Sequence, residues 1–294
     1  MTIRFLEGPA SCQGSPEWHQ FRKGKIGSSD AASIMNVGFK TPLQKYEEKV
    51  EGVQTPENEA MRRGKMLEPI VLGWVQEHYK IDLKSAVILH PNPKIDWHYS
   101  SVDGISQLPD GSWFVTEIKC GNRMDHELTM KGEIPEKYIP QLNHILEDCP
   151  GVNEILYSSY FETLGMAYVW YLRDEDELHH QFEEELAFYS KMITGIPPEP
   201  TDRDWVKLED PNLIDKTRRF TLIDEQIKDL EERRSILRHE IIKEIGDLRR
   251  AQIEYTKVQK IIRKGAIAYD QIEELKSIDI EKYRKDPVVS YRIS

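Results

Sequence analysis

The sequence is poor in cysteine and has no long apolar run. Its 3 cysteines, Cys12, Cys120 and Cys149, lie far apart and form no C-x-x-C pair. This pattern argues against a disulfide framework, a structural zinc and an iron–sulfur cluster, and it favours a reducing cytoplasm. No apolar run reaches the roughly 20 residues that a membrane-spanning helix needs. The N-terminal residues MTIRFLEGPASCQG also lack the apolar core of a secretory signal.

Positive charge is in deficit as well. The chain has 40 Lys and Arg against 51 Asp and Glu, a formal net charge of -11. This balance excludes a generic nucleic-acid coat protein. It does not exclude an enzyme that meets DNA phosphates locally, because basic residues gather in residues 19–25 and 62–65. Each cluster has a simpler alternative, a solvated helix or loop face.

The strongest candidate chemistry lies between Ser101 and Cys120, in SVDGISQLPDGSWFVTEIKC. The stretch predicts a β-hairpin, with Asp103 in a turn-like Ser-Val-Asp-Gly and a second turn at residues 109–111. Side chains alternate along a strand, so Glu117 and Lys119 share one face. Two carboxylates and an ammonium would then meet at one end of a sheet. The alternative is a surface hairpin whose Glu and Lys form a solvated pair.

These residue types suit a hard divalent cation. Mg²⁺ prefers oxygen ligands and needs only one or two carboxylates beside a substrate phosphate. Such an ion polarises a phosphoryl oxygen and lowers the pKa of a bound water. Lys119 would steady that water or offset charge that builds on the phosphate. We therefore expect a Mg²⁺ site at Asp103 and Glu117, with Mn²⁺ as a substitute.

Two further segments offer candidate site residues. A helix is expected over residues 59–79, with Glu68 beside an apolar stripe that includes Met66 and Ile70. A carboxylate there would be costly unless it is paired or metal-linked, and the alternative is an exposed Glu. Residues 26–35 predict a loop that turns into a helix capped by Ser28 or Ser29, whose N–H groups suit a phosphate. Residues 121–137 are expected to form a polar loop, in which His126 is more typical of a surface residue than of a ligand.

The motifs follow one another in the order of a known family. They are Trp18…Arg22…Ile26-Gly27-Ser28-Ser29-Asp30, Gly64…Leu67-Glu68, Ser101-Val102-Asp103-Gly104, Glu117-Ile118-Lys119-Cys120 and Tyr138…Gln141. Across about residues 15–170, the chain resembles the YqaJ-type viral recombinase family, the lambda-exonuclease-like branch of the PD-(D/E)XK nucleases. The resemblance implies an α/β fold with a restriction-endonuclease-like core, a mixed central sheet flanked by helices.

The resemblance also implies an activity and roles for individual residues. It implies a Mg²⁺-dependent exonuclease that degrades linear double-stranded DNA 5′ to 3′ and leaves single-stranded 3′ overhangs for phage-type homologous recombination. The implied metal ligands are Asp103, Glu117, the Ile118 carbonyl and Glu68, with Lys119 and Gln141 acting on the water. The implied 5′-phosphate contacts are Arg22, Ser29, Ser28, Ser101 and Tyr138. Some relatives carry a Thr where this chain has Gly27, which puts one phosphate contact in doubt.

The implied partners are double-stranded DNA ends, a single-strand annealing recombinase and other copies of the chain, a trimer in the best-known relative. The implied location is the cytoplasm of a bacterial host. Two alternatives remain open, a structure-specific or nicking endonuclease on the same core and a DNA-binding adaptor with a degenerate core. Intact Asp103, Glu117 and Lys119 speak against the adaptor.

Proline marks the expected domain boundary. We expect a nuclease domain over residues 1–196, a Pro-rich linker over 197–203 and a helical appendage with a small β-rich tail over 204–294. The appendage should hold one long helix suited to a coiled-coil seam or to docking, a turn at Gly265 and a helical stretch from Tyr269. Its apolar residues recur at steps of three, four and seven, namely Ile223, Ile227, Leu230, Leu237, Ile241 and Leu248, with Arg234 and Glu244 interrupting.

Overall fold

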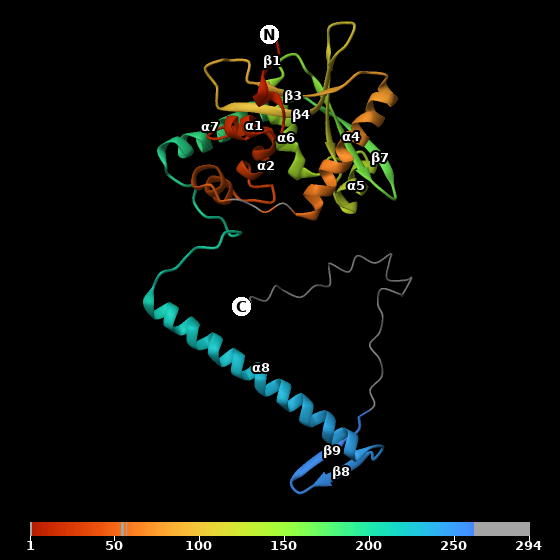
Figure 1. Ribbon diagram of the computed structural model, residues 1–294, viewed down its shortest axis with the longest axis vertical. Coiled ribbons are helices and arrows are strands. Elements are labelled where there is room, and N and C mark those ends of the chain that lie inside the picture. Colours follow the sequence, from red (N-terminus) through yellow and green to blue (C-terminus); the bar gives the residue numbers. More distant parts are fainter. Residues whose placement is uncertain (1, 54–55, 57, 262–294) are drawn as a thin grey trace. The chain divides into compact units, whose positions relative to one another are not determined.

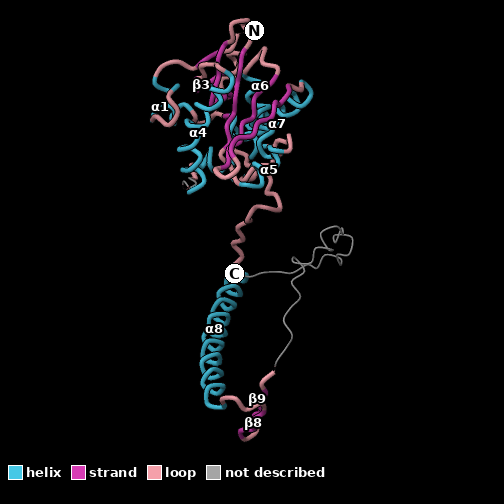
Figure 2. The backbone as a smooth tube through the Cα atoms, turned by 90° about the vertical axis from the view of Figure 1, so that its right-hand side faces the viewer, coloured by secondary structure: helices cyan, strands magenta, loops and turns pink. Residues whose placement is uncertain are grey.

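A mixed seven-stranded sheet organises the first part of the chain (Figures 1 and 2). Six strands follow the order β1-β3-β4-β5-β6-β7, and the short β2 pairs with β4. The β5–β6 and β2–β4 pairs are parallel, and the other neighbours are antiparallel. The strands are β1 (Arg4–Phe5), β2 (Ile26–Gly27), β3 (Lys84–Leu89), β4 (His98–Gln107), β5 (Trp113–Lys119), β6 (Glu154–Phe161) and β7 (Gly165–Leu172).

The structure is a computed structural model that describes residues 2–53, 56 and 58–261. The chain divides into two compact units, Met1–Val206 and Lys207–Ser294. The helices of the first unit are α1 (Pro16–Phe21), α2 (Ala31–Ile34), α3 (Pro42–Tyr46), α4 (Glu59–Tyr79), α5 (Arg123–Met130), α6 (Ile139–Asp148) and α7 (Glu175–Thr194). A 3-10 turn over Ser28–Asp30 leads into α2.

Helices cover both faces of the sheet. Leu142 and Ile145 of α6 and Leu178 of α7 are buried against sheet residues that include Ile88 and Val102. On the other face, Val75 of α4 is buried with Leu83, Phe114 and Leu156. The expected mixed sheet flanked by helices, followed by a long C-terminal helix, is confirmed.

Local sequence signals fix several helix starts. The Ser15 hydroxyl accepts a hydrogen bond from the Trp18 N–H, and Pro16 occupies the first position of α1. Thr41 and Gln44 form a capping box at α3. The Asn58 side chain accepts from the Met61 N–H at the start of α4, which spans the predicted residues 59–79.

The β4–β5 hairpin differs from the expectation at Asp103. Residues 101–104 are not a turn, because Asp103 and Gly104 lie inside β4 and the hairpin turns at residues 108–112. Gly104 is needed for packing, since a Cβ there would lie 2.8 Å from side-chain carbons of Leu72 and Thr116. Asp103 is therefore held in an extended strand against α4 rather than at a mobile corner.

Residues 121–137 also differ from the expected polar loop. Residues 123–130 form α5, which Asn122 caps by accepting from the Asp125 N–H. His126 is not a surface residue, because its side chain is 1% exposed and its Nδ1 lies 2.9 Å from the Ser159 hydroxyl. Residues 123–130 contain few apolar side chains, so the sequence does not indicate the helix, which packs on β6 and β7.

The Pro-rich boundary is attached to the first unit by its last residues. Arg203 donates hydrogen bonds to the Gly38 and Asn36 carbonyls at 2.9 Å. Asp204 accepts hydrogen bonds from Thr41 and from the Thr201 N–H. The first compact unit consequently extends to Val206.

The second unit contains α8 (Pro211–Ile245) and a hairpin of β8 (Arg250–Ile253) and β9 (Thr256–Gln259). The hairpin turns at Glu254 and Tyr255. The turn expected at Gly265 and the helix expected from Tyr269 lie outside the described residues. Among the described helices, none is both long and apolar enough to span a membrane.

Candidate active site

Two carboxylates lie at the end of the β4–β5 ladder. The last pair of this antiparallel ladder is Gly104 with Thr116, and Asp103 and Glu117 are the next residue on each strand. The Ile118 N–H donates to Asp103 Oδ2 at 2.7 Å, which fixes the orientation of that carboxylate. Glu117 is 2% exposed, and Lys119 Nζ lies 2.6 Å from its Oε1. The structure therefore brings Asp103, Glu117 and Lys119 together.

Helix α6 adds Gln141 to this group. The Gln141 amide donates to Glu117 Oε1, the same oxygen that Lys119 contacts. Glu117 Oε2 is buried and has no hydrogen-bond partner. An unpaired buried carboxylate oxygen is costly unless something else binds it.

Glu68 approaches from α4, although not on the expected stripe. Met66 and Ile70 are 74% and 49% exposed, whereas Val71 and Val75 form the buried face of the helix. Glu68 lies three and seven residues before them, so it shares their face. It is close enough to Asp103 and Lys119 for electrostatic coupling.

The crowding of acids raises carboxyl pKa values at this site. Burial, together with the Asp103 charge, raises the pKa of Glu117 to about 8. Burial and the same Asp103 charge raise the pKa of Glu68 to about 7. Burial also raises the pKa of Asp103, against the opposing effect of Lys119. Three acids that resist ionisation together are typical of a site that binds a cation.

The donor set fits a hard divalent cation. Carboxylate oxygens of Asp103, Glu117 and Glu68 are the ligands that Mg²⁺ and Mn²⁺ prefer. The buried, unpartnered Glu117 Oε2 is the specific atom that such an ion would satisfy. A ligand role for the Ile118 carbonyl stays a prediction.

A cavity of about 190 Å³ joins Asp103 and Glu117 to the predicted phosphate residues, whereas Glu68 does not line it. Eight of the predicted site residues line it, namely Arg22, Ser28, Ser29, Ser101, Asp103, Glu117, Lys119 and Gln141. Arg22 comes from the end of α1, and the two serines come from the 3-10 turn after β2. The parallel pairing of β2 with β4 brings these distant segments to the same strand that carries Asp103.

Two lining residues present polar hydrogens with no partner. Trp18 Nε1 and the Ser101 hydroxyl are buried and make no hydrogen bond. The Arg22 guanidinium stacks on the Trp18 ring at 4.3 Å from its centroid. Two orphan donors beside an arginine are the complement of an anionic ligand such as a phosphate.

Sequence reasoning missed Tyr99 and left Gly27 as a doubt. Both line the cavity, and a Cβ at Gly27 would lie 2.6 Å from the Tyr99 hydroxyl and ring. Tyr99 in turn hydrogen-bonds Arg22. A larger residue at position 27 would displace the tyrosine that holds the arginine. In the sequence, the run Trp97-His98-Tyr99-Ser100 predicts only a strand and does not mark Tyr99 as a site residue.

Tyr138 is the phosphate candidate that the cavity does not include. Its hydroxyl lies 3.3 Å from Asp125 Oδ2, and its ring lies 5.5 Å from Lys119 Nζ. Tyr138 therefore forms a wall beside Lys119 rather than a direct contact within the pocket.

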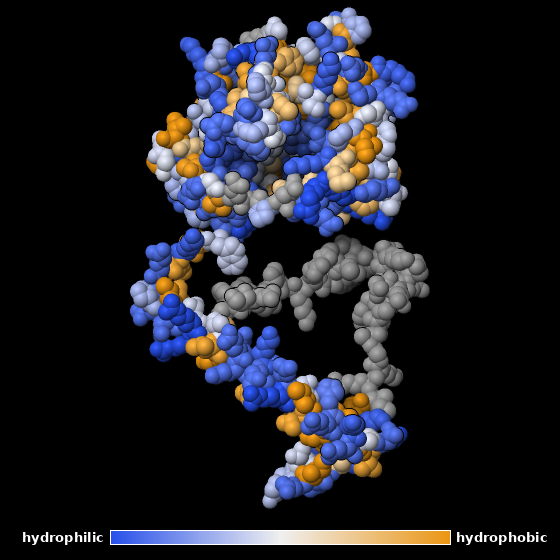
Figure 3. All heavy atoms as spheres, in the orientation of Figure 1, coloured by the Kyte–Doolittle hydropathy of each residue, from blue (hydrophilic) through white to orange (hydrophobic). Residues whose placement is uncertain are grey.

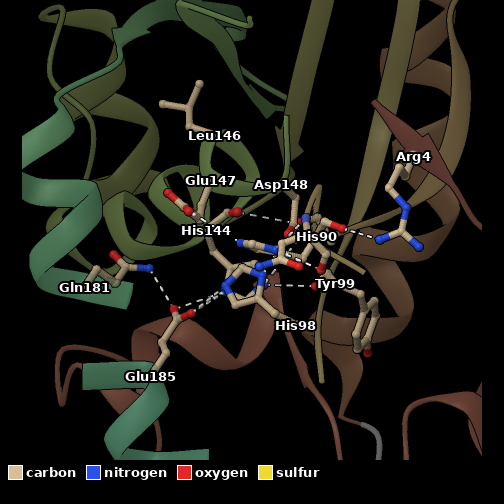
Figure 4. Close-up of polar contacts among 12 residues, drawn as sticks. Arg4, His90, His98, Tyr99, His144, Leu146, Glu147, Asp148, Gln181 and Glu185 are labelled. Carbon is tan, nitrogen blue, oxygen red and sulfur yellow. Dashed lines mark hydrogen bonds and ion pairs between the residues drawn. The ribbon is translucent and has the colours of Figure 1, made fainter. Parts of the chain in front are cut away.

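A buried histidine–carboxylate cluster lies behind the site, between β4, α6 and α7 (Figure 4). The rings of His98 and His144 stack with centroids 3.7 Å apart and an interplanar angle of 7°. His98 contacts Asp148 and Glu185 at 2.8 Å, one through each ring nitrogen. His144 Nε2 lies 2.9 Å from the Tyr99 carbonyl, and its Nδ1 lies 3.0 Å from Glu185 Oε1. All four side chains are at most 1% exposed.

Ligand atoms of His98, His144 and Asp148 lie within 4.8 Å of one another, as in a metal site. The ring stacking argues for an ion-pair cluster instead. The lone pairs of two stacked rings lie in separate parallel planes, whereas a shared metal needs them to converge on one point about 2 Å from each nitrogen. Although burial opposes it, Asp148 and Glu185 raise the pKa of His98 to about 10, so this ring carries a proton and has no lone pair to offer.

The comparisons agree with the geometry. The model of the YqaJ-like viral recombinase domain matches residues 17–147, a range that contains every predicted site residue. The chain is similar to an alkaline exonuclease (LHK-Exo) from Laribacter hongkongensis, with 25% identity, a TM-score of 0.52 and coverage of 62% of this chain and 94% of that chain. LHK-Exo in complex with dAMP gives 25% identity, a TM-score of 0.53 and the same coverage. No curated protein matches the chain.

Proposed function

Residues 17–147 match the YqaJ-like viral recombinase domain, and on that premise we propose that the protein is a divalent-metal-dependent exonuclease. It degrades linear double-stranded DNA from 5′ ends and leaves single-stranded 3′ overhangs. The family and the similar alkaline exonuclease support a nuclease. The observation that carries the finer proposal is the cavity, in which a carboxylate pair and a phosphate-type pocket share one space.

The acids have the role of holding the cation. Asp103, Glu117 and Glu68 supply carboxylate oxygens, and the Ile118 N–H keeps Asp103 in place. When bound, a Mg²⁺ or Mn²⁺ ion polarises the phosphoryl oxygen and makes a water more acidic.

Lys119 acts as a cation rather than as a base. Although burial opposes it, Glu117 and Asp103 raise the pKa of Lys119 above its usual value. Its ammonium therefore stabilises negative charge on the phosphate or orients the attacking water. The new bond joins the water oxygen to phosphorus, the bond from phosphorus to O3′ breaks, and O3′ leaves with a proton. Gln141 keeps Glu117 aligned during this exchange.

The pocket around Arg22 has the role of binding the 5′ end of the DNA strand. Arg22, Ser28, Ser29 and Ser101 surround the terminal 5′-phosphate of the strand being digested. A hydroxyl end lacks the charge that these donors recognise, so it binds weakly. Tyr138 shapes the pocket from beside Lys119.

Recombination supplies the biological setting of the proposal. The resected 3′ strands serve a single-strand annealing recombinase, in the cytoplasm of a bacterial host. Association of several copies around DNA, such as a trimer, would keep the enzyme on its substrate.

The test is digestion of matched linear and covalently closed circular duplexes, each labelled at defined ends, with Mg²⁺ and with EDTA. The proposal expects loss of label from 5′ ends of the linear duplex only, and only with Mg²⁺. Cutting of the circle would favour an endonuclease on the same core. Binding of either duplex without cleavage under any metal condition would favour an adaptor.

A further inference from the structure

Helix α8 exposes apolar side chains along its whole length. None of its 35 residues is buried. Leu230 is 62% exposed, Leu237 58% and Ile241 41%. A long helix with large exposed apolar residues needs a partner for them.

The C-terminal half of α8 forms one wall of an apolar groove. The β8–β9 hairpin and the residues around it form the other wall, and the groove has a volume of about 950 Å³. Figure 3 shows apolar residues gathered where the hairpin meets the end of α8. The apolar lining residues are Leu230, Leu237, Ile241, Ile242, Ile245, Leu248, Val258 and Ile261. A groove of this kind suits an amphipathic helix.

Helix α8 carries a heptad seam with two charged interruptions, and the part of the seam that lines the groove is Leu230, Arg234, Leu237 and Ile241. The seam positions of α8 are Phe220, Ile223, Ile227, Leu230, Arg234, Leu237, Ile241 and Glu244, at alternating steps of three and four. Arg234 and Glu244 occupy the two different core positions of the heptad. They carry opposite charges, and they flank Leu237 and Ile241.

The placement of these charges selects one pairing. In a parallel pair of identical helices, each seam residue meets its own copy, so Arg234 would face arginine and Glu244 would face glutamate. In an antiparallel pair, one register sets Arg234 opposite Glu244 of the second copy, twice by symmetry. The same register sets Leu237 opposite Ile241. Shifting it by a heptad places both charges against apolar residues.

We propose that the C-terminal unit is a self-association module. Helix α8 of a second copy lies antiparallel along this seam and covers the groove, with Arg234 of each copy paired to Glu244 of the other. The overlap covers residues 233–245, a length of about 20 Å at 1.5 Å per residue. Leu230 and the residues of the β8–β9 hairpin extend the contact between the two copies beyond this helical overlap. The module does not depend on the proposed nuclease activity.

Charge reversal tests the pairing on the full chain. Sedimentation at increasing protein concentration should show association of the wild type that Arg234→Glu or Glu244→Arg weakens by about 100-fold or more, because each variant places like charges together twice. The double variant R234E/E244R should restore association. A mixture of the two single variants should also associate. Lys228→Glu and Glu232→Arg, which change charge outside the seam, serve as controls and should behave as wild type.

Cysteine pairs test the direction. In a Cys12→Ser background, a chain with Leu237→Cys mixed with a chain with Ile241→Cys should form a disulfide between copies, because the antiparallel register brings these positions together. Leu237→Cys alone should cross-link poorly. Efficient cross-linking of Leu237→Cys alone would indicate a parallel pair and overturn the proposal.

Two further outcomes would also overturn it. One is equal association of the wild type and both single-charge variants. The other is a wild type that stays monomeric at all concentrations, which would mean that another part of the chain or a different partner occupies the groove. Far-UV circular dichroism of the charge variants, which reports the helix content, separates loss of association from failure to fold.

Discussion

Asp103 and Glu117, both acidic, directly follow the last pair of the β4–β5 ladder, Gly104 with Thr116, and the Asp103 charge acts on Glu117. Such a cross-strand pair opposes folding by up to about 1 kcal/mol, and here burial adds to the cost. The fold tolerates this repulsion at a site where a bound cation would turn it into attraction.

Replacing Asp103 with Asn should stabilise the metal-free protein while abolishing cleavage. Asn keeps an oxygen for the Ile118 N–H and removes the repulsion, so Tm in EDTA should rise by about 2–4 °C. Cleavage of linear duplex should fall by about 1000-fold or more, and Mg²⁺ should no longer raise Tm. Asp82→Asn, at an exposed position, is the control for the charge change. A variant that still gains stability from Mg²⁺ would remove Asp103 from the metal site.

Replacing Lys119 with Ala should reduce kcat by about 100-fold or more and leave DNA binding near wild type. The reason is that the ammonium acts on charge that develops at the phosphate rather than on the bound ground state. Single-turnover cleavage and a separate binding assay in Ca²⁺ distinguish the two effects. Lys131→Ala, on an exposed residue, is the matched control. Full activity of Lys119→Ala would contradict the assignment.

Replacing Arg22 with Ala should erase the preference for phosphorylated ends. Arg22 is the cation among the proposed 5′-phosphate contacts, so its loss should slow digestion of a 5′-phosphate end by about 10-fold to 100-fold and leave a 5′-hydroxyl end unaffected. Initial rates on the two substrates measure the ratio. Lys23→Ala changes the neighbouring exposed charge and should keep the preference. Equal rates on both ends in the wild type would show that the pocket has another role.

The buried histidine–carboxylate cluster should make the protein less stable at alkaline pH. The pKa of His98 is raised from 6.5 to about 10 in the fold. Its contribution to the free energy of unfolding is therefore complete below pH 6.5, and it is lost as pH rises to about 10, with a slope of at most about 1.4 kcal/mol per pH unit. Urea unfolding at pH 6, 8 and 10 measures this slope. His98→Gln should flatten it, and His179→Gln, on the exposed face of α7, should not.

The same cluster should position Gln141. His144 lies one helical turn after Gln141 in α6, and its Nε2 contacts the Tyr99 carbonyl of β4. His144→Gln should lower kcat by about tenfold with little change in KM, because α6 then loses its fixed distance from Glu117. In a Gln141→Ala background, the same change should cost much less. Fully additive losses would indicate a general effect on stability instead.

The sequence reveals local signals better than it reveals long-range contacts. The D-x13-E-x-K spacing is readable because both carboxylates come from one hairpin, and Ser15, Thr41 and Asn58 mark helix starts through local hydrogen bonds. Asp103-Gly104 has the composition of a turn. In the fold, the glycine instead admits Leu72 from α4, a contact that no local pattern encodes.

The histidine cluster shows the same limit. Its four members come from positions 98, 144, 148 and 185, on three elements, and each alone is an ordinary polar residue in the sequence. Only the i, i+4 spacing of His144 and Asp148 hints that they share a helix face. Their burial depends on α7 closing over α6, which is decided by packing.

Alternate residues of strand β4 line both the proposed phosphate pocket and the proposed metal site of the cavity. Tyr99, Ser101 and Asp103 all line it, and neighbouring members are two residues apart, about 6.6 Å in an extended strand. In the proposed exonuclease, this fixed spacing along β4 would hold the captured end of the DNA at a constant distance from the bond that is cut. A constant distance on this scale predicts that the digest consists of mononucleotides rather than short oligomers when the products are separated by chromatography.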